Sequence, residues 1–172
     1  MNSRLTSLFI GVLFLFLSST IYGQTYIMGE TSGVITTCSG IIENPGGFGS
    51  YTINQDVTQT ICSGNGQCIQ LTFTEFGTEA CCDQLTVYDG TSNFDNILNE
   101  YAGAINPGVV TCSGGAGGCI TLNFQSDGSI NSSGFRANIS CVSYPASIIL
   151  GQGGDSISTC LGLLLDPSGS SN

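Results

Sequence analysis

The sequence predicts an all-β domain built as an antiparallel sandwich of two sheets. Apolar side chains recur at every second position in several short segments, and Gly, Asn, Asp or Ser residues bound each segment. Residues 26–144 show no apolar stripe of the kind that an amphipathic helix carries. Many short strands separated by turns favour two sheets packed face to face.

Four segments carry the alternation that predicts strands. In each of them, polar side chains stand between the apolar ones, so one face of the strand is expected to be buried. The apolar positions are Ile69, Leu71 and Phe73; Leu85 and Val87; Ile120, Leu122 and Phe124; and Phe135, Ala137 and Ile139.

The N-terminus has the pattern of a secretory signal. Arg4 precedes an apolar run at residues 8–17, and the small residue Gly23 follows. Signal peptides have apolar regions of roughly 7–15 residues, whereas a membrane anchor needs about 20. We therefore expect a signal peptide over residues 1–23 and a secreted or cell-surface protein, with no membrane insertion after cleavage.

The rest of the chain divides into a domain, a linker and the start of a repeat. One domain is expected over residues 26–144, followed by a Gly-rich linker at residues 145–154. Residues 35–47 reappear, with conservative changes, as residues 157–169. We interpret residues 155–172 as the truncated start of a second repeat, because a core needs at least about 40 residues. Chance similarity between Gly- and Ser-rich segments is the alternative.

The composition excludes several classes of function. The chain has no His and no Lys, and its two bases stand against 12 acids, for a formal charge of -10. A Ser-His-Asp or Cys-His nucleophile and a His-ligated zinc are therefore excluded. Nucleic acid is not an expected partner, because so few cations cannot neutralise a row of phosphates. We expect a protein that is not an enzyme.

The nine cysteines indicate a disulfide framework, because thiols in an oxidising compartment form bridges. A tetrathiolate zinc site is the alternative, but no two cysteines have the C-x2–4-C spacing of such sites. The vicinal pair Cys81 and Cys82 suggests redox chemistry, although no base lies near in sequence to lower a thiol pKa.

An acidic loop lies between two of the predicted strands. It contains Glu75, Glu79 and Asp83 and no basic residue. Carboxylates in one place repel one another, so the loop either faces water or holds a cation. Hard oxygen ligands without His suit calcium. A glycosidase carboxylate pair is disfavoured, because nothing in the sequence supplies a Trp-lined sugar cleft.

The acidic loop belongs to a segment that resembles the CUB domain family. The family pattern F-x-x-F-x-x-E followed by D-x-L-x-V-x-D-G is met by Phe73, Phe76, Glu79, Asp83, Leu85, Val87, Asp89 and Gly90. The pattern F-x-S-D-x-S followed by G-F-x-A is met by Phe124, Ser126, Asp127, Ser129, Gly134, Phe135 and Ala137. The resemblance covers about residues 37–141 and implies a CUB-like sandwich of jelly-roll type. Asp89 and Gly90 are interpreted as a structural turn pair.

The resemblance also implies a metal site. In calcium-binding members of the family, three carboxylates from these motifs hold the ion, so calcium is the expected cofactor here. The implied ligands are the side chains of Glu79, Asp83 and Asp127, with backbone oxygens near Gly128 and Ser129. The loop from Glu79 to Asp83 is shorter than in many animal members, and Cys82 stands where Tyr usually precedes the Asp.

The resemblance settles the cysteine pairing only in part. It implies a first bridge between Cys38 and Cys62. The family's second bridge would need a cysteine at the position of Ala102. Cys81 and Cys82 therefore bridge each other or pair with other cysteines, and the remaining connectivity stays open.

The function implied by the resemblance is that of a noncatalytic binding or adhesion module. Its expected partner is an extracellular protein or glycan, bound with calcium, and a basic group of the partner is expected to approach the three carboxylates. Glu75 and Ser129, near the rim of this site, are the candidate contact residues. The domain also resembles repeats of large secreted Bacteroidetes-type bacterial proteins. Two alternatives stay open. The first is that the domain is an accessory of a secreted hydrolase whose catalytic part lies beyond residue 172. The second is that it is a purely structural repeat.

Overall fold

The predicted strands are present in the computed structural model, which describes residues 23–114 and 116–144. The predicted signal peptide up to residue 22, the linker and the second repeat lie outside the described residues. The elements are β1 (Thr25–Ile27), β2 (Val34–Thr36), β3 (Ser39–Glu43), β4 (Asp56–Cys62), β5 (Cys68–Gly77), β6 (Gln84–Asp89), β7 (Asn96–Tyr101), β8 (Val109–Thr111), the 3-10 helix η1 (Ala116–Gly118), β9 (Cys119–Gln125) and β10 (Gly134–Val142). No helix in this part of the chain has the length and apolar character needed to cross a membrane.

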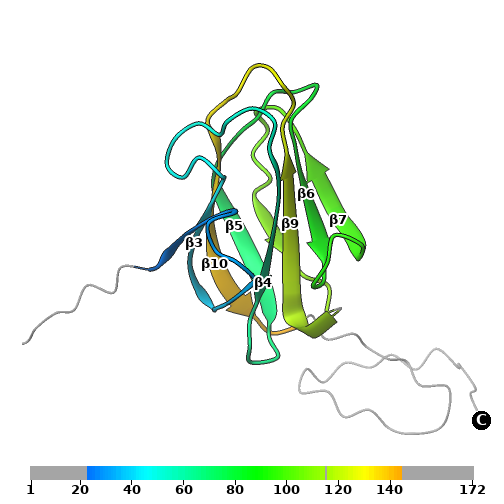
Figure 1. Ribbon diagram of the computed structural model, residues 1–172. Coiled ribbons are helices and arrows are strands. Elements are labelled where there is room, and N and C mark those ends of the chain that lie inside the picture. The colour runs from blue at the N-terminus through cyan, green and yellow to red at the C-terminus, as the bar shows by residue number, and fades with distance from the viewer. Residues whose placement is uncertain (1–22, 115, 145–172) are drawn as a thin grey trace, which may run out of the picture.

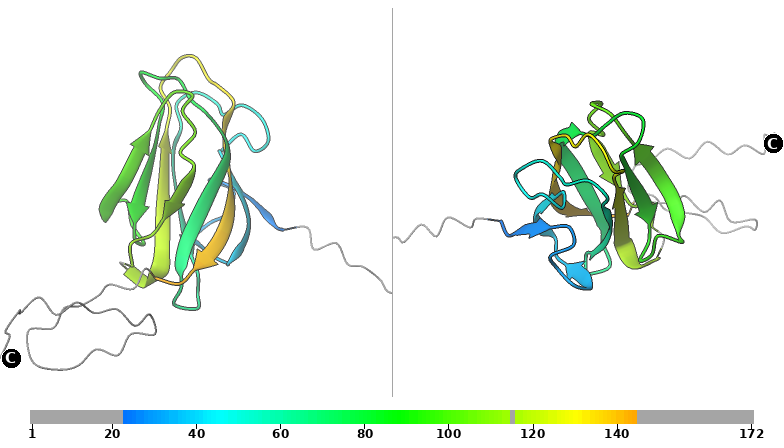
Figure 2. Two further views of the ribbon diagram at one scale, coloured as in Figure 1. Left: turned by 180° about the vertical axis from the view of Figure 1, so that it is seen from behind. Right: turned by 45° about the horizontal axis from the view of Figure 1, so that its top comes forward.

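These strands form two five-stranded sheets that pack face to face, so the predicted sandwich is confirmed (Figures 1 and 2). The first sheet has the order β1-β3-β10-β5-β8 and the second the order β2-β4-β9-β6-β7. Most neighbours are antiparallel, but β1 runs parallel to β3 and β2 runs parallel to β4. The sheets are therefore mixed at these edges. The chain crosses from the first sheet to the second and back between β1 and β3, so no direct hairpin joins the parallel partners.

The core includes every side chain that the alternation predicted to be buried. All eleven lie in β5, β6, β9 and β10 and are at most 4% exposed. Burying one such side chain contributes roughly 1.5–3 kcal/mol. The two sheets are thus held together by the inward faces of these four strands.

A β-bulge in β5 departs from the simple alternation. Phe73 pairs with Ala137 and Glu75 pairs with Arg136, so Thr74 has no residue opposite it on β10. The extra residue shifts the alternation by one position, and Phe76 packs against Phe73 with ring centroids 6.2 Å apart. The F-x-x-F spacing is therefore the sequence signature of a bulge. The bulge places Glu75 in β5 and lies just before the loop that carries Glu79 and Asp83.

The structure contradicts the expected bridge between Cys38 and Cys62. The four bridges are Cys38–Cys141, Cys62–Cys119, Cys68–Cys112 and Cys81–Cys82. Cys62 lies directly opposite Cys119 in the antiparallel pair β4 and β9. Cys38 precedes β3 and faces the end of β10, since Ser39 pairs with Ser140. The register of neighbouring strands, which the family's usual pairing does not anticipate, brings these sulfur atoms together.

Candidate functional site

The candidate site lies at the end of the sandwich where three loops meet (Figure 1). These loops are residues 44–55, residues 78–83 between β5 and β6, and residues 126–133 between β9 and β10. A hydrogen bond joins the first loop to the third: Asn54 N–H donates to the carbonyl of Asp127 at 2.7 Å. Three of the four disulfide bridges lie at the opposite end of the sandwich, where β4 and β10 finish and β5 and β9 begin. They are Cys38–Cys141, Cys62–Cys119 and Cys68–Cys112.

The loops bring the three predicted metal ligands together. Glu79, Asp83 and Asp127 each offer a carboxylate oxygen, and these oxygens lie within 4.8 Å of one another. Asp83 is fully buried, whereas Glu79 and Asp127 are half-buried. Glu79 and Asp83 face each other across a tight turn, in which Asp83 N–H donates to the carbonyl of Glu79 at 3.4 Å. We call these three residues the carboxylate cluster.

Tyr51 is the residue of the site that the sequence analysis missed. Its hydroxyl donates to Oδ2 of Asp83 and accepts the backbone N–H of Glu79 at 3.1 Å. Its ring is fully buried and packs edge-on against Phe124, with centroids 4.8 Å apart. Burial, followed by the hydrogen bond to Asp83, raises the pKa of Tyr51 to about 12, so the hydroxyl stays protonated at neutral pH.

The position of Tyr51 explains why it was missed. A buried tyrosine needs a partner for its hydroxyl, and this need is the one signal that the sequence carries. Tyr51 lies in a loop outside the strand alternation, so nothing local indicates where its hydroxyl points.

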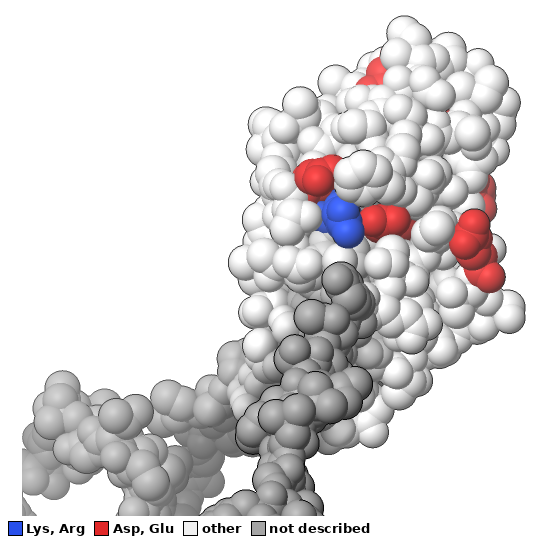
Figure 3. All heavy atoms as spheres, turned by 90° about the vertical axis from the view of Figure 1, so that its left-hand side faces the viewer, with Lys and Arg blue, Asp and Glu red and all other residues white. Residues whose placement is uncertain are grey.

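The carboxylate cluster has no basic partner. Arg136 is the one base of the described chain, and its Nε lies 3.3 Å from Oε1 of Glu43, with the guanidinium over the ring of Phe48. Figure 3 shows this base between carboxylates on one face of the domain. Burial, followed by the charges of Asp127 and Asp83, raises the pKa of Glu79. The ionised cluster is therefore costly unless a cation joins it.

Three oxygen atoms of the cluster, two of Asp83 and one of Glu79, test whether a metal ion fits. Asp83 is fully buried, and its two oxygens accept one hydrogen bond each, from Tyr51 and from Asp127 N–H at 2.9 Å. Oε2 of Glu79 is buried and has no hydrogen-bond partner among the described residues. A buried carboxylate oxygen without a donor is costly. This set of oxygens suits a hard divalent cation such as calcium.

The other predicted contact residues lie around the cluster in different ways. Ser129 donates to Oδ1 of Asp127 from its N–H at 2.8 Å and from its hydroxyl at 3.2 Å. Gly128 is exposed in the same loop, and a metal-binding role for its carbonyl stays a prediction. Glu75 is exposed on β5, opposite Arg136, and is not a member of the carboxylate cluster.

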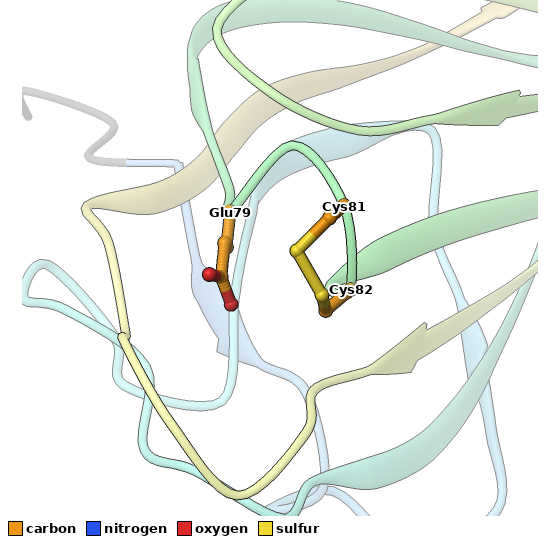
Figure 4. Close-up of side chains that lie close together, drawn as sticks. All are labelled: Glu79, Cys81 and Cys82. Atoms are coloured by element: carbon orange, nitrogen blue, oxygen red, sulfur yellow. A yellow bond between two sulfur atoms is a disulfide. The ribbon is translucent and has the colours of Figure 1, made fainter.

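The turn between Glu79 and Asp83 contains the vicinal bridge Cys81–Cys82, which answers the open question of how these cysteines pair. Both residues are exposed. Figure 4 shows the two sulfur atoms pointing toward the side on which the Glu79 carboxylate lies. The two sulfurs and a Glu79 oxygen also lie within 4.8 Å of one another. Glu79, Cys81 and Cys82 thus form a second group of possible metal ligands. While the disulfide is intact neither cysteine offers a thiolate, so this group is not a site for a soft metal.

Comparison with known proteins identifies the family. The model of the CUB domain family matches residues 31–139, and the chain therefore belongs to this family. Tolloid-like protein 2 of the mouse is 31% identical over 107 residues, which are 60% of this chain and 10% of that protein. The chain thus corresponds to about a tenth of that relative.

Solved structures have the same fold. The extracellular region of zebrafish Gpr126/Adgrg6 matches 64% of this chain and 14% of its own length, with a TM-score of 0.55 and 25% identity. The calcium-bound CUB2 domain of MASP-1 matches 64% of this chain and 98% of its own length, with a TM-score of 0.54 and 20% identity. CUB domains are typically extracellular protein-interaction modules, and these matches support a noncatalytic binding module.

Proposed function

We propose that this domain binds an extracellular partner protein through its carboxylate cluster, ordered by one calcium ion. The observation that carries the proposal is the convergence of the Glu79, Asp83 and Asp127 carboxylates, together with a buried oxygen of Glu79 that has no hydrogen-bond partner among the described residues. The calcium-bound MASP-1 domain, which has the same fold, adds support. Calcium, when bound, supplies the positive charge that the cluster lacks, and the residues of the chain hold it and shape the surrounding loops.

The charge of the site indicates the kind of partner. Three carboxylates outweigh the two charges of calcium, so the occupied site keeps a net negative rim. The chain has a formal charge of -10, and its one described base is bound to Glu43. Such a field attracts a basic group from solution, so the proposed partner presents a Lys or Arg to this rim. Ser129 and Glu75 are the proposed outer contacts.

The two alternative functions, an accessory domain of a hydrolase and a purely structural repeat, predict different observations. An accessory role in a hydrolase requires a catalytic domain beyond residue 172, and reading the gene past that point decides it. A purely structural repeat requires that the folded domain binds neither calcium nor a partner.

Calcium binding is tested by titrating the metal-free domain with calcium in a calorimeter and by thermal unfolding. Calcium at a hundredfold excess over Kd should stabilise the domain by about 2.7 kcal/mol. Asp127→Ala should abolish both signals. Glu100→Ala is the matched control, because Glu100 is an exposed acid on β7 and carries the same charge. Equal binding by wild type and Asp127→Ala would contradict the proposed site.

A further inference from the structure

We propose that the Cys81–Cys82 disulfide is a reducible switch that sets the calcium affinity of the carboxylate cluster. This inference rests on the proposed calcium site. The bridge occupies the turn between two of the ligands, and Ala80 is the only other residue in that turn. A change in the turn therefore moves Glu79 relative to Asp83.

The bridge restrains the backbone of this turn. A disulfide between adjacent residues closes a small ring through their shared planar peptide bond, so both residues lose much of their freedom in φ and ψ. The backbone N–H of Asp83 and the carbonyl of Glu79 meet at 3.4 Å across the turn. Reduction removes the ring and leaves only hydrogen bonds to close the turn. These are the long backbone bond and the bonds that the hydroxyls of Tyr51 and Thr78 make to Glu79 and Asp83.

The two ligands on either side of the bridge are held unequally. Asp83 is fixed from several directions, because its carboxylate accepts from Tyr51 and Asp127 and its carbonyl accepts from the hydroxyl of Thr78 at 3.1 Å. The Glu79 carboxylate has a buried oxygen without a partner and two like charges beside it. The backbone of the turn therefore keeps Glu79 in the cluster when no calcium is bound. Once the ring opens, charge repulsion moves Glu79 outward, and calcium must order it again on binding.

Exposure makes this bridge the one that a reductant reaches first. Cys81 and Cys82 are both exposed, whereas Cys68, Cys112 and Cys119 are at most 4% exposed. Cys38, Cys62 and Cys141 are half-buried at the other end of the sandwich. Each of the three other bridges thus has at least partial protection from attack.

The reaction is thiol–disulfide exchange with a dithiol, either a small molecule or a secreted dithiol protein. A thiolate of the dithiol attacks one sulfur, the Cys81–Cys82 bond breaks, and a mixed disulfide forms. The second thiolate of the dithiol then displaces the cysteine and closes its own disulfide. The domain gains two electrons and two protons as two thiols, and the dithiol is oxidised. Arg136 is the one base of the described residues and is paired with Glu43, so it is not available to stabilise a thiolate here. The pair therefore acts as a switch and not as an oxidoreductase centre.

The experiment uses dithiothreitol as the reductant and calcium as the ligand. The protein is reduced in steps, free thiols are mapped by alkylation and peptide mass spectrometry, and calcium affinity is measured at each step by calorimetry. Cys81 and Cys82 should be alkylated first. The Kd for calcium should then rise at least about tenfold, the effect of ordering roughly one more residue on binding. Reoxidation should restore the original Kd.

The double variant Cys81→Ser/Cys82→Ser holds the turn open without reductant and should show the same raised Kd. Its unfolding curve without calcium checks that it is folded, and stepwise reduction of the wild type decides the question if it is not. An unchanged Kd in protein reduced only at Cys81 and Cys82 overturns the switch and leaves the calcium site standing. Absence of calcium binding by the fully oxidised protein overturns both.

Discussion

At the scale of single residues, Tyr51 connects the apolar core to the carboxylate cluster. Its ring packs on Phe124, while its hydroxyl holds both the Asp83 carboxylate and the Glu79 backbone. Tyr51→Phe leaves these groups unpaired, so we expect a loss of about 1–3 kcal/mol in the free energy of unfolding and weaker calcium binding. Urea unfolding and calorimetry measure the two effects. Tyr101→Phe is the control, because Tyr101 packs on Phe73 and its hydroxyl makes no hydrogen bond to the cluster within the described residues, unlike that of Tyr51; equal losses in both variants would contradict the role of Tyr51.

Glu79 makes the stability of the metal-free domain depend on pH. Burial, followed by the charges of Asp127 and Asp83, raises the pKa of Glu79 in the folded state above its value in the unfolded chain. The folded state therefore binds this proton more tightly, and the contribution of Glu79 is fully present below the unfolded pKa. It is lost as pH rises through the folded pKa. The side chain of Gln does not ionise, so we expect Glu79→Gln to remove the part of the stability loss at rising pH that Glu79 causes. Melting curves of chelator-treated wild type and variant across the acid range should converge at low pH and separate as pH rises.

At the scale of elements, the bulge in β5 places the acidic loop while keeping both phenylalanines on the core. Thr74 has no partner on β10, whereas Thr72 pairs with Asn138 in the regular ladder. Deletion of Thr74 should therefore leave a folded domain, because every remaining residue keeps its partner and its face. Deletion of Thr72 should prevent folding, because a one-residue slip sends one side of the strand to the wrong face. Near-ultraviolet circular dichroism and thermal unfolding distinguish these results, and equal damage by both deletions would argue against the bulge.

At the scale of the whole molecule, the Cys38–Cys141 bridge clamps the first and last parts of the domain together. It spans 103 residues, nearly the whole sandwich, so a pull on the two ends of the domain passes through this bridge. The oxidised domain should extend only by residues outside the clamp. Full reduction should release on the order of 350 Å of further chain, at about 3.4 Å per residue. Single-molecule stretching measures this length. Cys81→Ser/Cys82→Ser is the control. The bridge that it removes joins adjacent residues and encloses no loop, so the extension of this variant should match that of the oxidised wild type. Equal extension of the wild type before and after full reduction would contradict the clamp.

Much of this fold follows from local patterns in the sequence. The alternation at Ile69, Leu71 and Phe73 and its counterparts is enough to predict which side chains are buried, because strand geometry places every second residue on one face. The choice of Glu79, Asp83 and Asp127 came from the resemblance of two short motifs to the family, and the structure brings these three acids together.

The sequence by itself determined the four strands β5, β6, β9 and β10 and the two-sheet class, which depend on neighbours a few positions away. It pointed to the three carboxylates only through the resemblance of two motifs to a family. Only the tertiary structure decided that Cys38 joins Cys141, that Tyr51 reaches Asp83, and that the first strands of both sheets lie parallel to their partners. These features depend on which distant segments become neighbours and in what register. Strand order and register arise when both sheets close over one core, and no local periodicity records them.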